Sequence, residues 1–158
     1  MLLIGLPGSG KSTLATLLCA PPNAAIVVST DSIRAQLFGD EAVQGSWLKI
    51  WLEVRRQFQA AIAQIEAETI DFAIYDATNA VRKQRRQAID LARKTGFTEV
   101  TGLWLNVPLS VCLERNQERD RQVPEAIVLR MARRLNGAPP SGEEGFDRVI
   151  EIKNFDLN

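Results

Sequence analysis

Histidine is absent from this chain of 158 residues, which removes the commonest general base and the commonest metal ligand of proteins. A proton acceptor must therefore be a carboxylate. Cysteine is scarce, and both examples, Cys19 and Cys112, lie within helical patterns. We interpret them as small buried apolar residues in a reducing compartment rather than as a disulfide or a metal pair.

An excess of charge of either sign is also missing. The 19 basic residues balance 19 acidic ones, so no global positive field indicates a nucleic-acid partner, although local basic patches remain open. Long apolar runs that could span a bilayer are lacking, and Met1 enters an apolar segment without the basic flank or cleavage site of a signal peptide. We therefore expect a cytoplasmic protein with no membrane partner. The sequence does not indicate an oligomeric state.

Apolar segments with strand character alternate with helical patterns along the whole chain, which predicts an α/β fold with one five-stranded parallel sheet and helices on both faces. Residues 137–145 are rich in glycine and proline, so we expect a loop that is free to move. The predicted strands are 1–4, 25–29, 72–75, 99–105 and 148–152. The predicted helices are 11–20, 32–37, a long one containing 47–65, 81–94, 109–119 and 124–135.

The segment Gly5 to Ser12 reads Gly-Leu-Pro-Gly-Ser-Gly-Lys-Ser and fits the phosphate-binding pattern Gly-x4-Gly-Lys-Ser/Thr. It joins a predicted strand to a predicted helix, so backbone N–H groups and the helix dipole would face an anion. A chance glycine-rich turn is the alternative, but it does not explain why a strand precedes the loop, a helix follows it and Lys-Ser stands at the matching positions. Lys11 would reach the β- and γ-phosphates, and the Ser12 hydroxyl would bind Mg²⁺. The expected nucleotide-binding residues are Gly8, Ser9, Gly10, Lys11, Ser12 and Thr13.

Asp31 follows the second predicted strand, and Arg34 lies three residues later on the same helix face. Transfer of a phosphoryl group to an alcohol needs a carboxylate that takes the hydroxyl proton and cations that neutralise the phosphate. Asp31 is therefore the candidate catalytic base, and Arg34 is the candidate phosphate contact. Asp31 could instead cap the short helix. The lack of histidine favours the base.

Asp76 closes the third predicted strand, in Asp-Ala-Thr-Asn. Ligands of open parallel sheets bind beyond the carboxyl ends of the strands, which directs Asp31 and Asp76 toward the phosphate loop. Asp76 could hold Mg²⁺ directly or through water. Alternatively, Asp76 and Asn79 could form a turn by bonding local backbone. The metal site is favoured because the phosphate loop already gives a reason for Mg²⁺.

Three arginines, Arg115, Arg119 and Arg121, gather near one predicted helix end. Arg115 and Arg119 are one helical turn apart, so both would face the nucleotide if this helix forms a lid over the phosphates. Composition alone favours a solvated helix whose arginines pair with neighbouring acidic residues.

Two other groups of side chains have a structural and a functional interpretation. Trp47 and Trp51 belong to an apolar stripe with steps of three and four, which we interpret as core packing rather than as an acceptor pocket. A basic cluster after Asp76 could line a nucleic-acid backbone, but an ordinary solvated helix face is favoured. Its members are Arg82, Lys83, Arg85 and Arg86.

Together these motifs resemble the polynucleotide 5′-kinase module of bacterial end-healing enzymes, over nearly the whole chain. The matching segments are 8–13, 29–34, 76–79, 106–108, 111–116, 120–123 and 144–146, in the same order. The resemblance implies ATP as donor, Mg²⁺ as cofactor, Asp31 as general base, and Arg34 on the acceptor or transferring phosphate. Asp76 would assist the acceptor or the metal. It also implies lid arginines on the β- and γ-phosphates, with Arg115 and Arg119 ahead of Arg121.

The sequence thus predicts one P-loop domain, residues 1–158, that phosphorylates a hydroxyl group, first of all the 5′-OH of a DNA or RNA end. We expect it to act without the phosphatase and ligase parts that often accompany such modules. A kinase of sugars, antibiotics or other small alcohols would use the same phosphate-binding residues and is one alternative. A regulatory nucleotide-binding switch is another, although the guanine-reading pattern Asn-Lys-x-Asp is absent.

Overall fold

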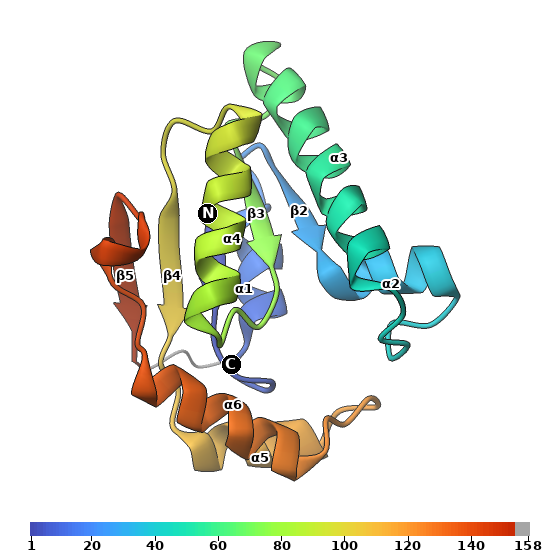
Figure 1. Ribbon diagram of the computed structural model, residues 1–158, viewed down its shortest axis with the longest axis vertical. Helices are drawn as coiled ribbons and strands as arrows, with labels where there is room; N and C mark the ends of the chain where they lie inside the picture. Colours follow the sequence, from blue (N-terminus) through green and yellow to red (C-terminus); the bar gives the residue numbers. More distant parts are fainter. Residues whose placement is uncertain (154–158) are drawn as a thin grey trace.

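A computed structural model describes residues 1–153 as an α/β fold built on one five-stranded sheet (Figure 1). Every strand pair is parallel, and the order across the sheet is β2-β3-β1-β4-β5. The predicted fold class is confirmed. The strands are β1 Leu2–Ile4, β2 Ala25–Ser29, β3 Phe72–Asp76, β4 Thr101–Leu105 and β5 Arg148–Ile152.

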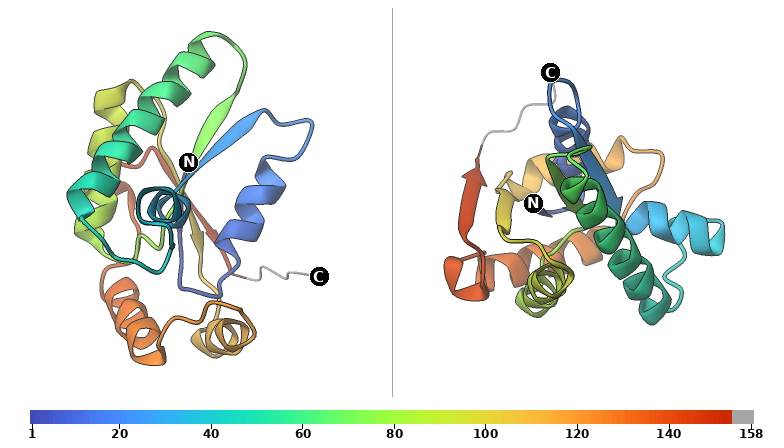
Figure 2. Two further views of the ribbon diagram at one scale, coloured as in Figure 1. Left: turned by 90° about the vertical axis from the view of Figure 1, so that its right-hand side faces the viewer. Right: turned by 90° about the horizontal axis from the view of Figure 1, so that it is seen from above.

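Helices cover both faces of the sheet. Helix α1 lies on one face, and α3 and α4 lie on the other (Figure 2). Helices α5 and α6 lie beyond the carboxyl ends of the strands, where the lid is predicted (Figure 1). The helices are α1 Lys11–Leu18, α2 Thr30–Phe38, α3 Trp47–Glu66, α4 Arg82–Thr95, α5 Leu109–Gln117 and α6 Glu125–Gly137, with a short 3-10 helix, η1, at Gly142–Glu144.

The core is divided between the two faces because successive strand residues point in opposite directions. Leu2 and Ile4 of β1 belong to the larger cluster, which includes residues of α3 and α4, whereas Leu3 packs with Ala15 of α1. Phe58 of α3 makes edge-to-face contact with Tyr75, with ring centroids 5.6 Å apart. The central strands are therefore buried on both sides, as parallel strands usually are.

The apolar stripe of α3 is rotated relative to the prediction. Ile50, Val54 and Phe58 are buried, whereas Trp47 is 46% exposed and stacks on Trp51. The prediction that Trp47 packs in the core is wrong, because Ile50 and not Trp47 is the residue of the first turn of α3 that faces the core. Trp51 is partly buried and packs against the core, as predicted.

The segment between α6 and β5 is anchored rather than free. Helix α6 continues to Gly137, residues 142–144 form η1, and Glu144 and Phe146 are buried. Residues 138–141 form the predicted loop, whereas residues 142–144 form η1, and the buried ion pair of Glu144 with Arg85 holds this part of the segment against α4.

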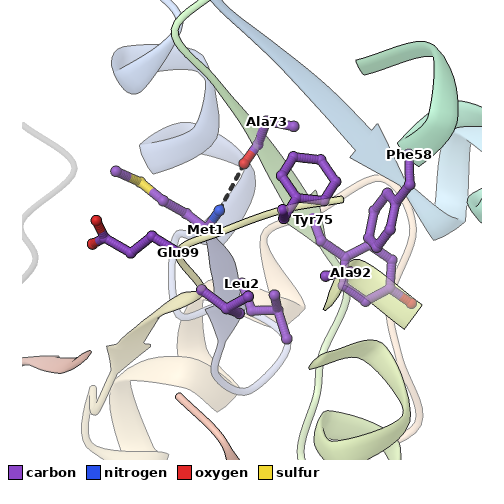
Figure 3. Close-up of a pocket in the computed structure, with 9 residues that line it drawn as sticks. Met1, Leu2, Phe58, Ala73, Tyr75, Ala92 and Glu99 are labelled. Atoms are coloured by element: carbon purple, nitrogen blue, oxygen red, sulfur yellow. Dashed lines mark hydrogen bonds between the residues drawn. The ribbon is translucent and has the colours of Figure 1, made fainter. Parts of the chain in front are cut away.

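A small cavity lies at the amino ends of the strands, where Met1, Leu2, Ala73 and Glu99 line it together with Phe58 (Figure 3). Its volume of about 20 Å³ suits a single water molecule rather than a substrate. The phosphate loop lies at the opposite end of β1. Among residues 1–153, none of the helices combines the length and apolar character that crossing a membrane requires.

Candidate active site

The phosphate loop lies at the carboxyl end of β1 and leads into α1. Gly8 and Gly10 have φ angles of +82° and +92°, a region that glycine occupies without steric cost. A Cβ atom on Gly8 would lie 2.3 Å from the carbonyl oxygen of Cys112, so the loop packs directly on α5. Ser9 is fully buried, and its hydroxyl has no hydrogen-bond partner within the described residues. The loop thus has the tight curvature of an anion cradle.

Lys11 closes this loop, because its Nζ donates a hydrogen bond to the carbonyl oxygen of Leu6 at 2.8 Å. Burial lowers the pKa of Lys11 to about 8, and the negative charge of Asp76 opposes that shift. The charges of Arg119 and Asp31 also act on the Lys11 pKa, in opposite directions. Lys11 is therefore the centre of a group of charged side chains, which come from the segments after β2 and at the end of β3 and from the loop between α5 and α6.

Asp76 of β3 meets Ser12 of α1. The Ser12 hydroxyl donates to Asp76 Oδ2 at 3.0 Å. Burial raises the pKa of Asp76, while Lys11 and the Ser12 hydrogen bond lower it. Two oxygen ligands side by side fit Mg²⁺, which takes few protein ligands and completes its shell with phosphate and water oxygens. No cluster of three acidic or thiol side chains suited to a metal occurs in residues 1–153, so a metal held by this pair would take its remaining ligands from phosphate and water.

Asp31 lies in the first turn of α2, because that helix begins at Thr30 and not at residue 32 as predicted. The amino-terminal cap is Ser29, whose hydroxyl oxygen accepts from the N–H of Ser32 at 3.3 Å. The alternative that Asp31 merely caps this helix is therefore wrong. Asp31 Oδ1 instead accepts from Arg34 Nη1 at 2.6 Å. The Asp31 side chain is 48% exposed, and the Arg34 side chain is only 14% exposed.

Arg34 has donor capacity left over. Its Nε is buried without a hydrogen-bond partner among the described residues. Its charge also acts on the buried hydroxyl of Tyr75, whose pKa is raised mainly by desolvation. Arg34 therefore orients Asp31 and keeps an unused donor at the same end of the sheet.

Residues 118–124, which we call the lid loop after the prediction, connect α5 to α6. Helix α5 ends at Gln117, so Arg119 lies in the loop, and the prediction that Arg115 and Arg119 share one helix is wrong. Buried Asn116 holds the loop that follows the helix. Its Nδ2 donates to the carbonyl oxygen of Val123 at 2.8 Å, and its Oδ1 accepts from the Val123 N–H at 3.0 Å. Sequence reasoning missed this pair of hydrogen bonds, although an asparagine on the buried face of a helix end was a usable signal.

The lid arginines take different positions. Arg121 Nη1 lies 3.3 Å from Asp31 Oδ2 and 3.1 Å from Glu41 Oε1, so the lid loop reaches across to the α2 side of the site. Arg119 acts on the pKa of Lys11. The pKa of the Cys112 thiol, which burial raises, is lowered by the charges of Lys11 and Arg115.

A buried polar network supports the loop from behind. The side-chain Nδ2 of Asn79 donates to the main-chain carbonyl oxygen of Leu3 at 2.7 Å. The main-chain carbonyl oxygen of Asn79 accepts from Arg85 Nη1 at 3.2 Å. Arg85 also donates to both carboxylate oxygens of Glu144, each at 2.6 Å. Both side chains of this ion pair are fully buried. Arg85 thus belongs neither to a solvated helix face nor to a nucleic-acid surface, which corrects both interpretations for this residue.

The parallel sheet and the Gly-x4-Gly-Lys-Ser loop after its central strand define a P-loop nucleotide-binding fold. Residues 1–138 match the family AAA_33, described as an AAA domain, and the chain belongs to that family. The resemblance found in the sequence is confirmed at the level of family and fold.

Individual relatives agree with this assignment. The chain is 28% identical over 135 residues to L-seryl-tRNA(Sec) kinase of Methanococcus maripaludis, a match that covers 83% of this chain and 50% of that protein. The chain therefore spans about half the length of the curated relative. Among solved structures, the Pnkp1/Rnl/Hen1 RNA repair complex matches with a TM-score of 0.67 and 17% identity, over 92% of this chain and 45% of the other. A sugar kinase from Janibacter sp. HTCC2649 matches with a TM-score of 0.63 and 19% identity, over 96% and 83% of the two chains.

Proposed function

We propose that the protein is an ATP- and Mg²⁺-dependent kinase that phosphorylates the 5′-OH of a DNA or RNA end. The observation that carries this proposal is the gathering of Lys11, Asp31 and Asp76 at one end of the sheet, where their charges act on one another. An accessible carboxylate held by an arginine beside a phosphate loop suits transfer to an alcohol.

In the proposed reaction, Asp31 takes the proton of the acceptor hydroxyl. The hydroxyl oxygen forms a bond to the γ-phosphorus of ATP, and the bond from that phosphorus to the β–γ bridging oxygen breaks, so ADP leaves. Bound Mg²⁺, held by Ser12 and Asp76, would neutralise phosphate charge. Residues 8–13 hold the triphosphate, and Lys11, Arg34, Arg115 and Arg119 stabilise the negative charge of the transferring group.

Arg121 has a role that differs between the free and bound states in this proposal. In the free protein it pairs with Asp31 and Glu41. A bound triphosphate offers Arg121 a stronger anionic partner, because arginine forms charge-assisted hydrogen bonds with phosphate. Its departure releases Asp31 Oδ2 for the acceptor hydroxyl.

A nucleic-acid acceptor is supported by the motifs shared with polynucleotide 5′-kinases and by what the relatives are called. The curated relative is named as a kinase of a seryl-tRNA, and one similar structure is described as an RNA repair complex. The same fold also occurs in a sugar kinase. The acceptor class must therefore be tested by direct competition.

The decisive assay offers labelled ATP to a 5′-OH oligonucleotide together with a panel of sugars, antibiotics and other small alcohols. We expect the label on the oligonucleotide and none on an oligonucleotide that already carries a 5′-phosphate. Label on a small alcohol instead would replace the acceptor, and ATP turnover without transfer to any acceptor would remove the kinase assignment.

The Asp31→Asn variant tests the base. We expect it to lose transfer by roughly 100-fold or more, because general-base contributions are typically of this size, while ATP still binds at least as tightly because Arg121 loses one of its two carboxylate partners. Glu41→Gln is the matched control, since it also neutralises a carboxylate that contacts Arg121. A full transfer rate in Asp31→Asn would exclude Asp31 as the base.

A further inference from the structure

An open groove lies near the carboxyl end of β3, beyond the turn that leads into α4. The first turns of α3 and α4 and the last turn of α6 surround it, and Figure 1 shows these helix ends around the same end of the sheet. The groove has a volume of about 650 Å³. Val81 lies two residues after Asn79, so one end of the groove adjoins the turn that follows Asp76. The lining residues are Trp47, Val81, Arg82, Lys83, Gln84, Gln87, Arg134 and Ala138.

The groove is basic. Arg82, Lys83 and Arg134 line it, and its described lining contains no acidic residue. Glu143 lies 3.4 Å from Arg82, but its side chain is 83% exposed, and such pairs in water are weak. The Nε of Arg82 is buried without a partner among residues 1–153. This distribution attracts a chain of phosphates, since polyanions bind where cations are grouped, and only Arg82 among these cations has an acidic partner among residues 1–153.

Trp47 adds an aromatic surface to the same groove. Its ring stacks on Trp51 with centroids 5.8 Å apart and an interplanar angle of 25°, so a neighbour holds it in place. Nearly half of the side chain remains exposed. Bases of any sequence stack on such rings, and an aromatic platform beside a basic groove is typical of sites for single-stranded nucleic acid.

We propose that this groove binds the two or three nucleotides that follow the 5′-terminal nucleotide of the acceptor strand. Lys83 and Arg134 contact phosphates, and Trp47 stacks on a base. This proposal rests on the proposed kinase function and deepens it, because a sugar or an antibiotic would occupy only the space at Asp31. It gives Trp47, Lys83 and Arg134 a role in acceptor selection and none in the chemical step.

The first test measures kcat/KM for acceptors of one, two, three and six nucleotides. We expect kcat/KM to rise with length in the wild-type protein. Trp47→Ala and the double variant Lys83→Ala/Arg134→Ala should each lose about fivefold or more on the six-nucleotide acceptor and be unchanged on the single nucleotide. Trp47→Phe should restore most of the loss. Arg133→Ala is the matched control, because Arg133 is exposed on the same helix outside the groove lining.

The second test measures binding without transfer, from the fluorescence anisotropy of a 5′-OH hexanucleotide labelled at its 3′ end. Each lysine or arginine that is removed should reduce the slope of log affinity against log salt by about 0.7. If the oligonucleotide binds through the groove but no acceptor is phosphorylated, the kinase function fails and the groove stands. If transfer occurs but the groove variants bind and react like wild type, or lose equally on all lengths, the groove proposal is overturned.

Discussion

Lys11 is the side chain most sensitive to pH in the candidate site. In the free protein burial lowers its pKa to about 8, against the attraction of Asp76. The protonated form attracts the triphosphate, so ATP affinity should be full below pH 8 and fall as the pH rises through that value. The protonated fraction decreases by about tenfold between pH 7 and pH 9, and we expect a similar loss of affinity.

Calorimetric titration with ATP across this range checks the prediction. Lys11→Arg keeps its charge throughout, so the affinity of that variant should be flat between pH 7 and pH 9. A flat profile in the wild-type protein would show that Lys11 does not control nucleotide binding through its charge.

Gly8 shows how closely the phosphate loop is packed. Its φ of +82° and the 2.3 Å distance from an added Cβ to the carbonyl oxygen of Cys112 leave no room for alanine. We expect Gly8→Ala to displace the loop and to weaken ATP binding by at least about tenfold, while the far end of the sheet stays intact.

Gly39 provides the matched control for this substitution. It has a similar φ of +79° but nothing within 4 Å of an added Cβ. Gly39→Ala should therefore show the backbone strain, about 1 kcal/mol of unfolding free energy, without loss of ATP affinity. Equal ATP affinity in the two variants would contradict a packing role for Gly8.

Helix α4 and η1 are joined by the buried ion pair of Arg85 and Glu144. Removing one partner leaves an uncompensated buried charge, and we expect Arg85→Met or Glu144→Met to cost about 3–5 kcal/mol of unfolding free energy. The double variant Arg85→Met/Glu144→Met should recover most of that loss, because a buried pair can often be replaced by apolar side chains.

Urea denaturation of the four proteins gives the coupling energy of this pair. Lys94→Ala is the surface control, because its pair with Asp90 is exposed and contributes little. Additive losses in the double variant would show that the two charges do not stabilise one another.

Local patterns predicted most of the elements because each strand is a short apolar run and each helix has a recognisable period. They failed where a partner lies far along the chain. Arg85 looks solvent-exposed in its basic neighbourhood, and only Glu144, 59 residues later, makes its burial possible. At the end of α5 the missed partner lies only seven residues away, and helical periodicity does not reveal a side-chain contact with the backbone such as that of Asn116 with Val123.

The candidate site divides along the same line. The phosphate loop, Asp31 and Asp76 could be placed from the sequence because each immediately follows a strand, and the topology of parallel sheets brings such positions together. The ion pairs of Arg121 could not be predicted from the sequence, since the path of a loop between two helices is set by tertiary contacts. The functional roles of all these residues remain predictions.

Arg121 joins two parts of the molecule, because its ion pairs link the lid loop to Asp31 of α2 and to Glu41. If Arg121 must leave these carboxylates to reach the phosphates, weakening the link favours nucleotide binding. We expect Glu41→Gln to raise ATP affinity by about two- to fivefold, the range that corresponds to an exposed ion pair. Titration with ATP measures this, and weaker binding in Glu41→Gln would instead make Glu41 part of the bound state.

The match to the family model ends at residue 138, but the counterion of Arg85 lies beyond it at Glu144. A fragment that ends at residue 138 would leave the buried Arg85 without its counterion and would remove β5, the strand that pairs with β4. Such a fragment should be insoluble when expressed. We expect a soluble piece to need β5, so an expression vector cut at the boundary of the family match would omit a strand that the sheet requires.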